Sequence, residues 1–195
     1  MVKLPDEDFA AFIFDCDGTL VDSMPLHHQA WCAAFQEHGA PFEFDWELFT
    51  RRAGMGLRET VEALNRQFEC ALDPVAVAAS QRAHYTRSID NVRPIERVIA
   101  LVRRFAGSKP MAVASGNDRA LVERALSQVG VVHLFDVILG RDDVERGKPH
   151  PDIFLRCADL MNVRPQQCLV FEDGASGIEA AKAAQMAWID VTQSG

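Results

Sequence analysis

Short apolar segments alternate with helical segments in the second half of this chain, and this alternation restricts the fold more than any other feature. Four apolar runs there predict strands, over residues 111–115, 135–140, 168–173 and 187–191. Strands that alternate with helices form a parallel sheet covered by helices on both faces. An earlier run, from Phe9 to Phe14, predicts a further strand buried on both faces. The sequence therefore predicts an α/β fold with a parallel central sheet.

The stretch from about residue 24 to residue 105 has helical spacing almost throughout, and no convincing strand is predicted in it. Pro25, Pro74 and Pro94 lie where proline is tolerated, in the first turn of a helix. We therefore predict a split α/β core domain, residues 1–20 and 90–195, with an inserted all-helical domain over residues 21–89.

Composition narrows the class of protein. The chain has 195 residues and a formal net charge of −8, which disfavours a nucleic-acid partner or an anionic membrane surface. The five cysteines are odd in number and form no C-x-x-C pair, so reduced thiols are expected rather than disulfides or zinc. Neither a signal peptide nor a run of membrane-spanning length is recognised, so we expect a cytoplasmic protein.

Polar side chains follow several of the predicted strands where those strands end. They are Asp15 and Asp17, Ser115, Lys148, and the pair Glu172 and Asp173. Ligands of open α/β sheets bind at the carboxyl ends of the strands, so these groups are expected to meet at one edge. Asp-x-Asp-Gly alone is typical of a turn, but together with the other three segments it indicates a catalytic site.

Clustered carboxylates repel each other unless a cation lies among them, and hard oxygen ligands without His or Cys favour Mg²⁺. Lys148 and Ser115 suit an anionic group, such as a phosphoryl, opposite the metal. One aspartate can then act as nucleophile and form an acyl phosphate, while the other transfers protons. Cys16, between the two aspartates, points to the opposite face and is expected in the core.

Four segments, DCDGTLVDS, VASGN, GKPHPDIF and FEDGASGI, resemble in order and spacing the four motifs of the haloacid dehalogenase (HAD) superfamily. The resemblance spans essentially the whole chain and implies a Rossmann-like core; the helical insertion is similar to that family's first cap type, C1. PDIFLRCADLMNVRPQQCLVFEDGASGIEAAKAA and DPVAVA resemble the β-phosphoglucomutase-like branch, and within it phosphatases of sugar phosphates of the fructose-1-phosphatase kind.

The resemblance implies a role for each matched position. Asp15 is the nucleophile and a Mg²⁺ ligand, and Asp17 is the general acid/base and a further ligand through its carbonyl. Asp173 binds the metal, with Glu172 as ligand or neighbour. Phosphoryl and substrate contacts are implied for Ser115, Gly116, Asn117 and Lys148. In the inserted domain the resemblance implies substrate contacts for His27 and Arg58, although both could equally be ordinary helix residues.

The function expected is a Mg²⁺-dependent phosphatase of small sugar phosphates, a monomer or weak homodimer. Related phosphomutases tend to carry a lysine soon after the hydroxyl of the second motif, whereas this chain has Asn117 and Asp118 there. Because Asp118 would repel a second phosphate, hydrolysis is favoured over a mutase. The sequence leaves two more functions open: a dehalogenase, which should need neither Asp17 nor the Glu172–Asp173 pair, and a binding module without turnover.

Overall fold

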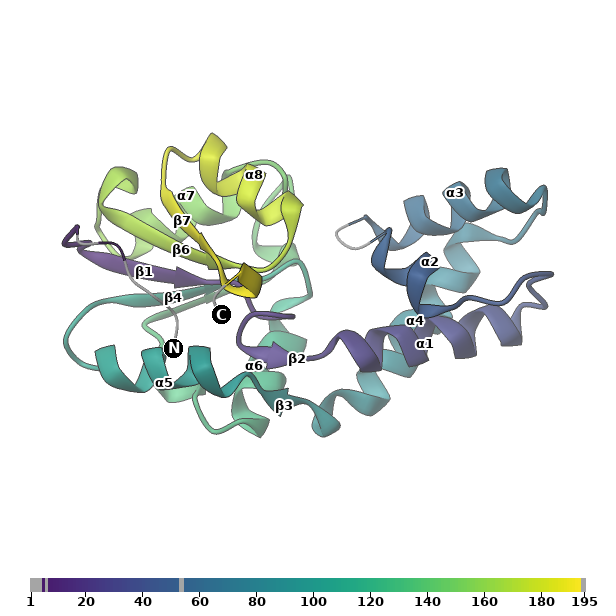
Figure 1. The fold of residues 1–195 in the computed structure, drawn as a ribbon, viewed down its shortest axis with the longest axis horizontal. Coiled ribbons are helices and arrows are strands. Elements are labelled where there is room, and N and C mark those ends of the chain that lie inside the picture. The colour runs from purple at the N-terminus through teal and green to yellow at the C-terminus, as the bar shows by residue number, and fades with distance from the viewer. Residues whose placement is uncertain (1–4, 6, 53–54, 194–195) are drawn as a thin grey trace. The chain divides into compact units, whose positions relative to one another are not determined.

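The computed structural model describes residues 5, 7–52 and 55–193 (Figure 1). The chain forms two compact units. One comprises Met1–Asp22 and Val92–Gly195, and the other is Ser23–Asn91. The first unit is an α/β structure, and the second is helical.

The α/β unit is built on a five-stranded sheet. Its strands are β1 (Ala11–Phe14), β4 (Met111–Ala114), β5 (Val137–Leu139), β6 (Cys168–Glu172) and β7 (Ala187–Asp190). Their order is β5-β4-β1-β6-β7, and every neighbouring pair is parallel. The predicted α/β fold with a parallel central sheet is confirmed. The chain builds the sheet outward from β1 on one side and then returns to the other side at β6, which makes β1 the switch point.

Helices cover both faces of this sheet, with α5 and α6 on one face and α7 and α8 on the other (Figure 1). They are α5 (Glu96–Phe105), α6 (Arg119–Gln128), α7 (Asp152–Leu160) and α8 (Ala175–Ala183). Alternation along β1 sends Ile13 into a cluster with the buried side of α7 and α8. Short 3₁₀ helices also occur among the described residues, at Ile89–Asn91, Val132–Leu134, Arg141–Asp143, Pro165–Gln167 and Val191–Gln193.

Aromatic rings on the opposite face hold the two central strands together. Phe14 of β1 and Phe171 of β6 stack with ring centroids 4.5 Å apart and an interplanar angle of 7°. Phe12 meets Phe105 of α5 edge-on, at 4.8 Å. Because Phe14 and Phe171 are also register partners, the last residues of β1 and β6 lie level with each other. This register brings the residues that follow the two strands to one place.

A small antiparallel ladder, β2 (Val21–Asp22) with β3 (Arg93–Pro94), joins the two chain segments that lead out of the α/β unit and back into it. The predictions that no strand lies between residues 24 and 105, and that Pro94 opens a helix, are therefore wrong. Pro94 pairs with Val21, and α5 begins at Glu96. Two-residue strands are too short to show alternation, and an edge strand tolerates the missing N–H of proline.

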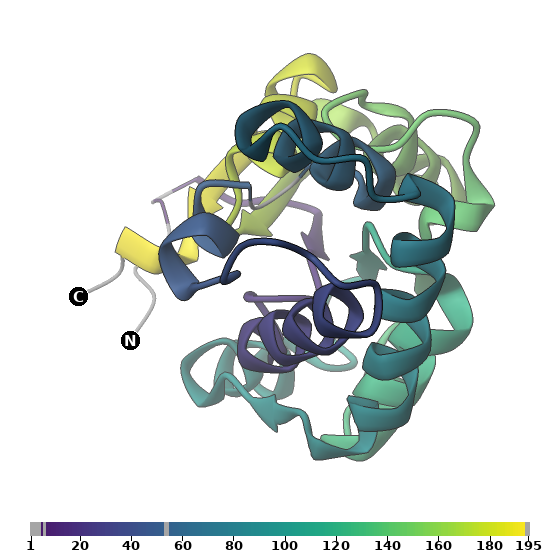
Figure 2. The same cartoon turned by 90° about the vertical axis from the view of Figure 1, so that its right-hand side faces the viewer.

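The second unit contains α1 (Met24–Glu37), α2 (Trp46–Thr50), α3 (Leu57–Phe68) and α4 (Pro74–Ser88), shown from two sides in Figures 1 and 2. Helix α4 packs against both α1 and α3. Trp31, Phe35 and Phe49 are buried in the core of this unit, whereas Trp46 is 48% exposed. Gly39, with φ of +66°, follows the end of α1 and adopts the left-handed conformation that suits a helix stop.

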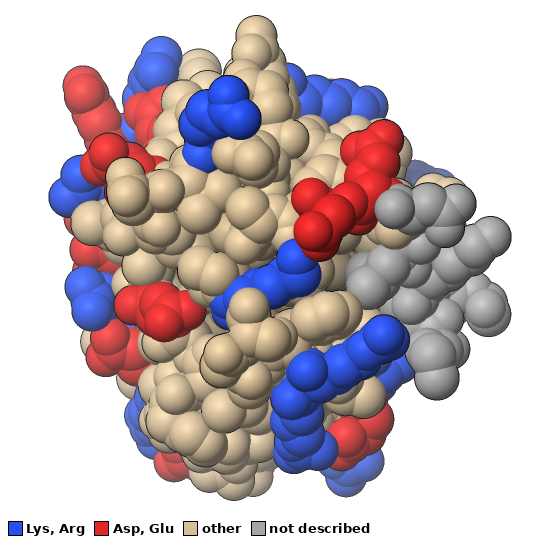
Figure 3. Space-filling model, turned by 90° about the vertical axis from the view of Figure 1, so that its left-hand side faces the viewer, with Lys and Arg blue, Asp and Glu red and all other residues tan. Residues whose placement is uncertain are grey.

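Charges of both signs are interspersed on the face drawn in Figure 3, and among the described residues visible there the positive side chains do not form one continuous patch. None of the helices in the described part of the chain combines the length and the apolar character needed to cross a membrane.

Candidate active site

Asp15 lies directly beyond β1 and is buried, with 6% exposure. Its N–H donates to the Phe171 carbonyl at 2.9 Å, so the pairing of β1 with β6 extends to this residue. Cys16 is buried, as predicted for a core residue. Gly18 follows with φ of +85°, a conformation that glycine adopts without strain, and the chain turns away from the sheet.

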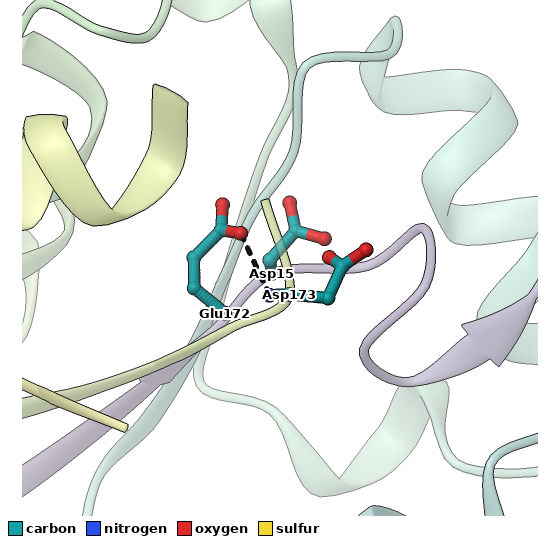
Figure 4. Close-up of side chains that lie close together, drawn as sticks. All are labelled: Asp15, Glu172 and Asp173. Atoms are coloured by element: carbon teal, nitrogen blue, oxygen red, sulfur yellow. Dashed lines mark hydrogen bonds between the residues drawn. The ribbon is translucent and has the colours of Figure 1, made fainter. Parts of the chain in front are cut away.

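Two more carboxylates reach the same place from the end of β6. Oxygen atoms of Asp15, Glu172 and Asp173 all lie within 4.8 Å of one another. Figure 4 shows Asp15 at the end of the purple strand and Glu172 with Asp173 at the end of the yellow-green one. Segments more than 150 residues apart in sequence thus form one acidic cluster, defined here as these three residues.

Lys148 supplies positive charge to the acidic cluster. Its ammonium donates to Asp15 Oδ1 at 2.6 Å and to Glu172 Oε1 at 2.7 Å. The lysine side chain is 9% exposed, and its ammonium also lies 5.1 Å from the centre of the Phe154 ring. Lysine is rarely buried unless it is paired, so these two carboxylates are what allow Lys148 to lie there.

Both carboxylate oxygens of Glu172 have hydrogen-bond partners. Oε1 accepts from Lys148, and Oε2 accepts from the backbone N–H groups of Asp173 and Gly174, at 2.9 and 2.7 Å. Gly177, in the first turns of α8, leaves room for this side chain, because a Cβ there would overlap the Glu172 carboxylate. Glu172 therefore orients Lys148 and the loop after β6 at the same time.

Asp173 is held by the loop that follows β1. The Thr19 hydroxyl, fully buried, donates to Asp173 Oδ1 at 3.2 Å. A Cβ on Gly18 would overlap Oδ2 of the same carboxylate. Gly18 thus has two functions, since it permits the positive φ and lets Asp173 approach the backbone beside Asp15.

Asp17 is bound from a third segment, the loop after β4. Its Oδ2 accepts from Asn117 Nδ2 at 2.8 Å and from the Ser115 hydroxyl at 3.3 Å. Ser115 continues β4, with its N–H donating to the Leu139 carbonyl at 3.0 Å. Gly116, between them, is exposed. The α/β unit therefore brings together all the candidate residues that the sequence places in it.

His27 and Arg58 belong to the second unit. The His27 ring stacks on Tyr85, with centroids 3.7 Å apart, and its Nδ1 lies 3.4 Å from the Gln81 amide nitrogen. Arg58 is exposed at the second position of α3. These observations do not test the substrate contacts predicted for His27 and Arg58, which stay predictions.

Comparison with known proteins agrees with this geometry. The family model of haloacid dehalogenase-like hydrolases matches residues 9–185. This chain belongs to the haloacid dehalogenase-like hydrolase family. The family predicted from the four motifs is confirmed.

Individual relatives cover nearly the whole chain. Fructose-1-phosphate phosphatase YqaB of Escherichia coli is 37% identical over 187 residues, covering 95% of this chain and 97% of the relative. The 6-phosphogluconate phosphatase of the same bacterium is 30% identical, covering 87% and 76%. The crystal structure of β-phosphoglucomutase from Clostridium difficile has a TM-score of 0.76 and 26% identity, covering 92% and 83%.

The electrostatics of this HAD-like site require additional positive charge. Burial raises the pKa of Asp15 well above its usual range, because Lys148 offsets only part of the effect of burial and of neighbouring Glu172 and Asp173. Burial, followed by the charge of Glu172, raises the pKa of Asp173 to about 6. Although burial opposes it, the carboxylates of Asp15 and Glu172 raise the pKa of Lys148, which stays charged.

Ionised, the acidic cluster carries three negative charges against the one positive charge of Lys148. A divalent cation would neutralise this excess, and the donors are all hard carboxylate oxygens. The cluster can therefore hold a metal ion.

Two contributors to the site, Thr19 and Gly177, are not among the residues that sequence reasoning identifies. Both lie inside the motifs, in DCDGTLVDS and FEDGASGI. Thr19 is a small polar residue close in sequence to Asp15 and Asp17, and a hydroxyl at such a position can donate a hydrogen bond to a carboxylate. Gly177 sits within a predicted helix, where glycine is unfavourable, and that misfit is the available signal.

Gly177→Ala is expected to destabilise the protein by about 2 kcal/mol, because the new methyl group displaces Glu172 from Lys148 and leaves buried charges poorly paired. Helix propensity alone predicts the opposite sign, a gain of about 1 kcal/mol. Urea unfolding measures the difference, with Glu179→Ala on the exposed face of α8 as control. A stability equal to or above that of the wild type would show that Gly177 does not make room for Glu172.

Proposed function

We propose that this protein is a Mg²⁺-dependent phosphatase that hydrolyses small sugar phosphates, such as fructose 1-phosphate or related hexose and polyol phosphates, through an aspartyl-phosphate. The observation on which this rests is the buried Asp15 carboxylate, 2.6 Å from the Lys148 ammonium and inside the acidic cluster. Membership of the hydrolase family and the relatives named as phosphatases of fructose 1-phosphate and 6-phosphogluconate support the reaction type.

In the first half-reaction an Asp15 oxygen forms a bond to phosphorus while the bond from phosphorus to the sugar oxygen breaks. Asp17 gives its proton to that leaving oxygen, so the sugar departs as an alcohol. Asp17 then takes a proton from water, which attacks the aspartyl-phosphate and regenerates Asp15 with release of inorganic phosphate. Lys148 and Ser115, with the backbone at Gly116, hold the transferring phosphoryl group.

The residues that would hold Mg²⁺ are Asp15, Asp173 and the backbone carbonyl of Asp17. When bound, the ion neutralises charge on the phosphoryl group and on the acidic cluster. Glu172, with both oxygens already engaged, fits the role of a neighbour that orients Lys148 rather than that of a direct ligand.

The second unit is proposed to act as a C1-type cap domain that provides substrate contacts, among them His27 and Arg58. We infer a cytoplasmic location, supported by cysteines that are all free thiols. A small phosphorylated metabolite is the proposed partner, with neither nucleic acid nor membrane involved, and the proposed state is a monomer or weak homodimer.

Two rival enzymatic functions share the aspartate nucleophile. A phosphomutase has support from the similarity to β-phosphoglucomutase, but Asp118 follows Ser115 closely and disfavours a second phosphate. A dehalogenase would need Asp15 but neither Asp17 nor the Glu172–Asp173 pair. Incubation with a panel of phosphorylated metabolites and Mg²⁺ tests the proposal. Stoichiometric inorganic phosphate is expected, whereas a hexose bisphosphate product would favour the mutase. Loss of the activity with a chelator would exclude the dehalogenase.

Asp15→Asn is expected to reduce phosphate release by at least about 1000-fold, because an amide oxygen cannot serve as the covalent nucleophile. Steady-state release of inorganic phosphate measures the effect. Asp159→Asn, an exposed change on α7, is the matched control and should leave the rate unchanged. A near-normal rate for Asp15→Asn would exclude the covalent route.

Lys148→Ala is expected to lower kcat/KM by about 100- to 1000-fold and to weaken inhibition by inorganic phosphate, because the charge that faces the phosphoryl group is lost. Lys182→Ala is the matched control, because it removes one positive charge at an exposed position of α8 that is not part of the acidic cluster. Equal effects of the two substitutions would show that Lys148 does not bind the phosphoryl group. Thermal unfolding of both variants checks that each is folded.

Mg²⁺ is expected to raise the melting temperature more at about pH 7.5 than at about pH 5. Without metal, the pKa of Asp173 is raised to about 6. Between about pH 4 and about pH 6, the folded state therefore holds a proton on Asp173 that the unfolded state has released. This contribution to stability falls as pH rises from about 4 to about 6, and Mg²⁺ replaces the proton above that range. Differential scanning calorimetry with and without Mg²⁺ measures the shift. Asp173→Asn should abolish most of it, and a shift independent of pH would argue against metal binding at Asp173.

A further inference from the structure

Asp17 contacts two neutral donors from the loop after β4. Its Oδ2 accepts from the Asn117 amide at 2.8 Å and from the Ser115 hydroxyl at 3.3 Å. An ionised carboxylate oxygen only accepts, so in that form the Asn117 amide presents its nitrogen to Asp17. The shorter of the two contacts is the one from Asn117.

The backbone of Asn117 is fixed on both sides. Its N–H donates to the Ser115 hydroxyl oxygen at 3.0 Å, and its carbonyl accepts from the Arg141 N–H at 2.8 Å. The latter bond ties the loop after β4 to the segment that follows β5. A side chain on a backbone held this way reaches Asp17 from a fixed position.

Ser115 cannot keep its contact with Asp17 throughout the proposed reaction. A hydroxyl has a single proton to donate, and in the structure the acceptor within reach of the Ser115 hydroxyl is Asp17 Oδ2, at 3.3 Å. When the hydroxyl donates to a phosphoryl group, as the proposed function requires, its bond to Asp17 is lost. Of the two donors from this loop, Asn117 then remains on Asp17.

We propose that Asn117 is a positioning residue whose side-chain amide holds the Asp17 carboxyl group in place for proton transfer to the leaving oxygen. This inference rests on the proposed function and changes the role that the family resemblance gives to Asn117, which is contact with the substrate. The two roles differ in a measurable way. A positioning residue affects only reactions that need the proton from Asp17, whereas a substrate contact affects any ester that occupies the same site.

Phenyl phosphate and 4-nitrophenyl phosphate provide the comparison. The two esters have nearly the same shape and lack the sugar, but 4-nitrophenolate leaves without a proton whereas phenolate needs one. The parameter kcat/KM covers binding and the steps up to transfer to Asp15, so the later hydrolysis step does not enter. We expect Asn117→Ala to lower kcat/KM for phenyl phosphate by about 10- to 100-fold and that for 4-nitrophenyl phosphate by less than about threefold.

Two further variants separate positioning from a general structural role. Asn117→Gln keeps the amide donor and should recover part of the rate with phenyl phosphate. In an Asp17→Asn background, Asn117→Ala should cause no additional loss, because the group that it positions is already gone. Thermal unfolding confirms that each variant is folded.

An equal loss with both esters, or a full additional loss in the Asp17→Asn background, would overturn the positioning role and leave the phosphatase assignment intact. A wild-type enzyme that releases phosphate from no ester in the presence of Mg²⁺ would instead overturn the proposed function, and this inference with it.

Discussion

The buried ammonium of Lys148, placed between Asp15 and Glu172, is the interaction on which the rest of the site depends. It joins the ends of β1 and β6 to the loop after β5. These three segments are not adjacent in the sequence. Removing one partner of such a buried arrangement typically costs about 3–5 kcal/mol, because a charge is left uncompensated. Replacing the whole group by apolar residues is often neutral or stabilising, so the pairing itself contributes little net stability.

Lys148 alone does not balance the carboxylates, and this imbalance explains the rest of the arrangement. Burial, together with the neighbouring carboxylates, raises the pKa values of Asp15 and Asp173, so protons or a cation are favoured at this cluster. Gly18 and Gly177 provide the space in which the acidic side chains approach each other and the backbone. Crowding and excess charge are both unfavourable to folding, and the apolar sheet around Phe14 and Phe171 offsets them.

Much of this arrangement can be predicted from the sequence, since strand–helix alternation sets the parallel sheet and the carboxyl ends of parallel strands share an edge. That reasoning predicts that Asp15, Ser115, Lys148 and Asp173 lie together. The prediction from sequence fails for features that leave no periodic pattern of apolar residues. The β2–β3 ladder is too short to leave a pattern, so helical spacing wrongly places Pro94 in a helix. The engagement of both Glu172 oxygens and the need for Gly177 depend on atoms that meet only after folding.

The two aspartates of the Asp-x-Asp pair lie in different surroundings, and the difference fits the two roles proposed for them. Asp15 is buried, which raises its pKa, and the neighbouring Lys148 ammonium opposes that rise and so assists the ionised form that the proposed nucleophile needs. Asp17 is half-buried and accepts from a neutral amide and a hydroxyl. The proton transfer proposed for Asp17 requires a group that can both hold and release a proton, and these two donors carry no charge that would oppose protonation. Asp17 lies next to the turn at Gly18 and contacts the loop after β4, whereas the backbone of Asp15 stays paired with β6.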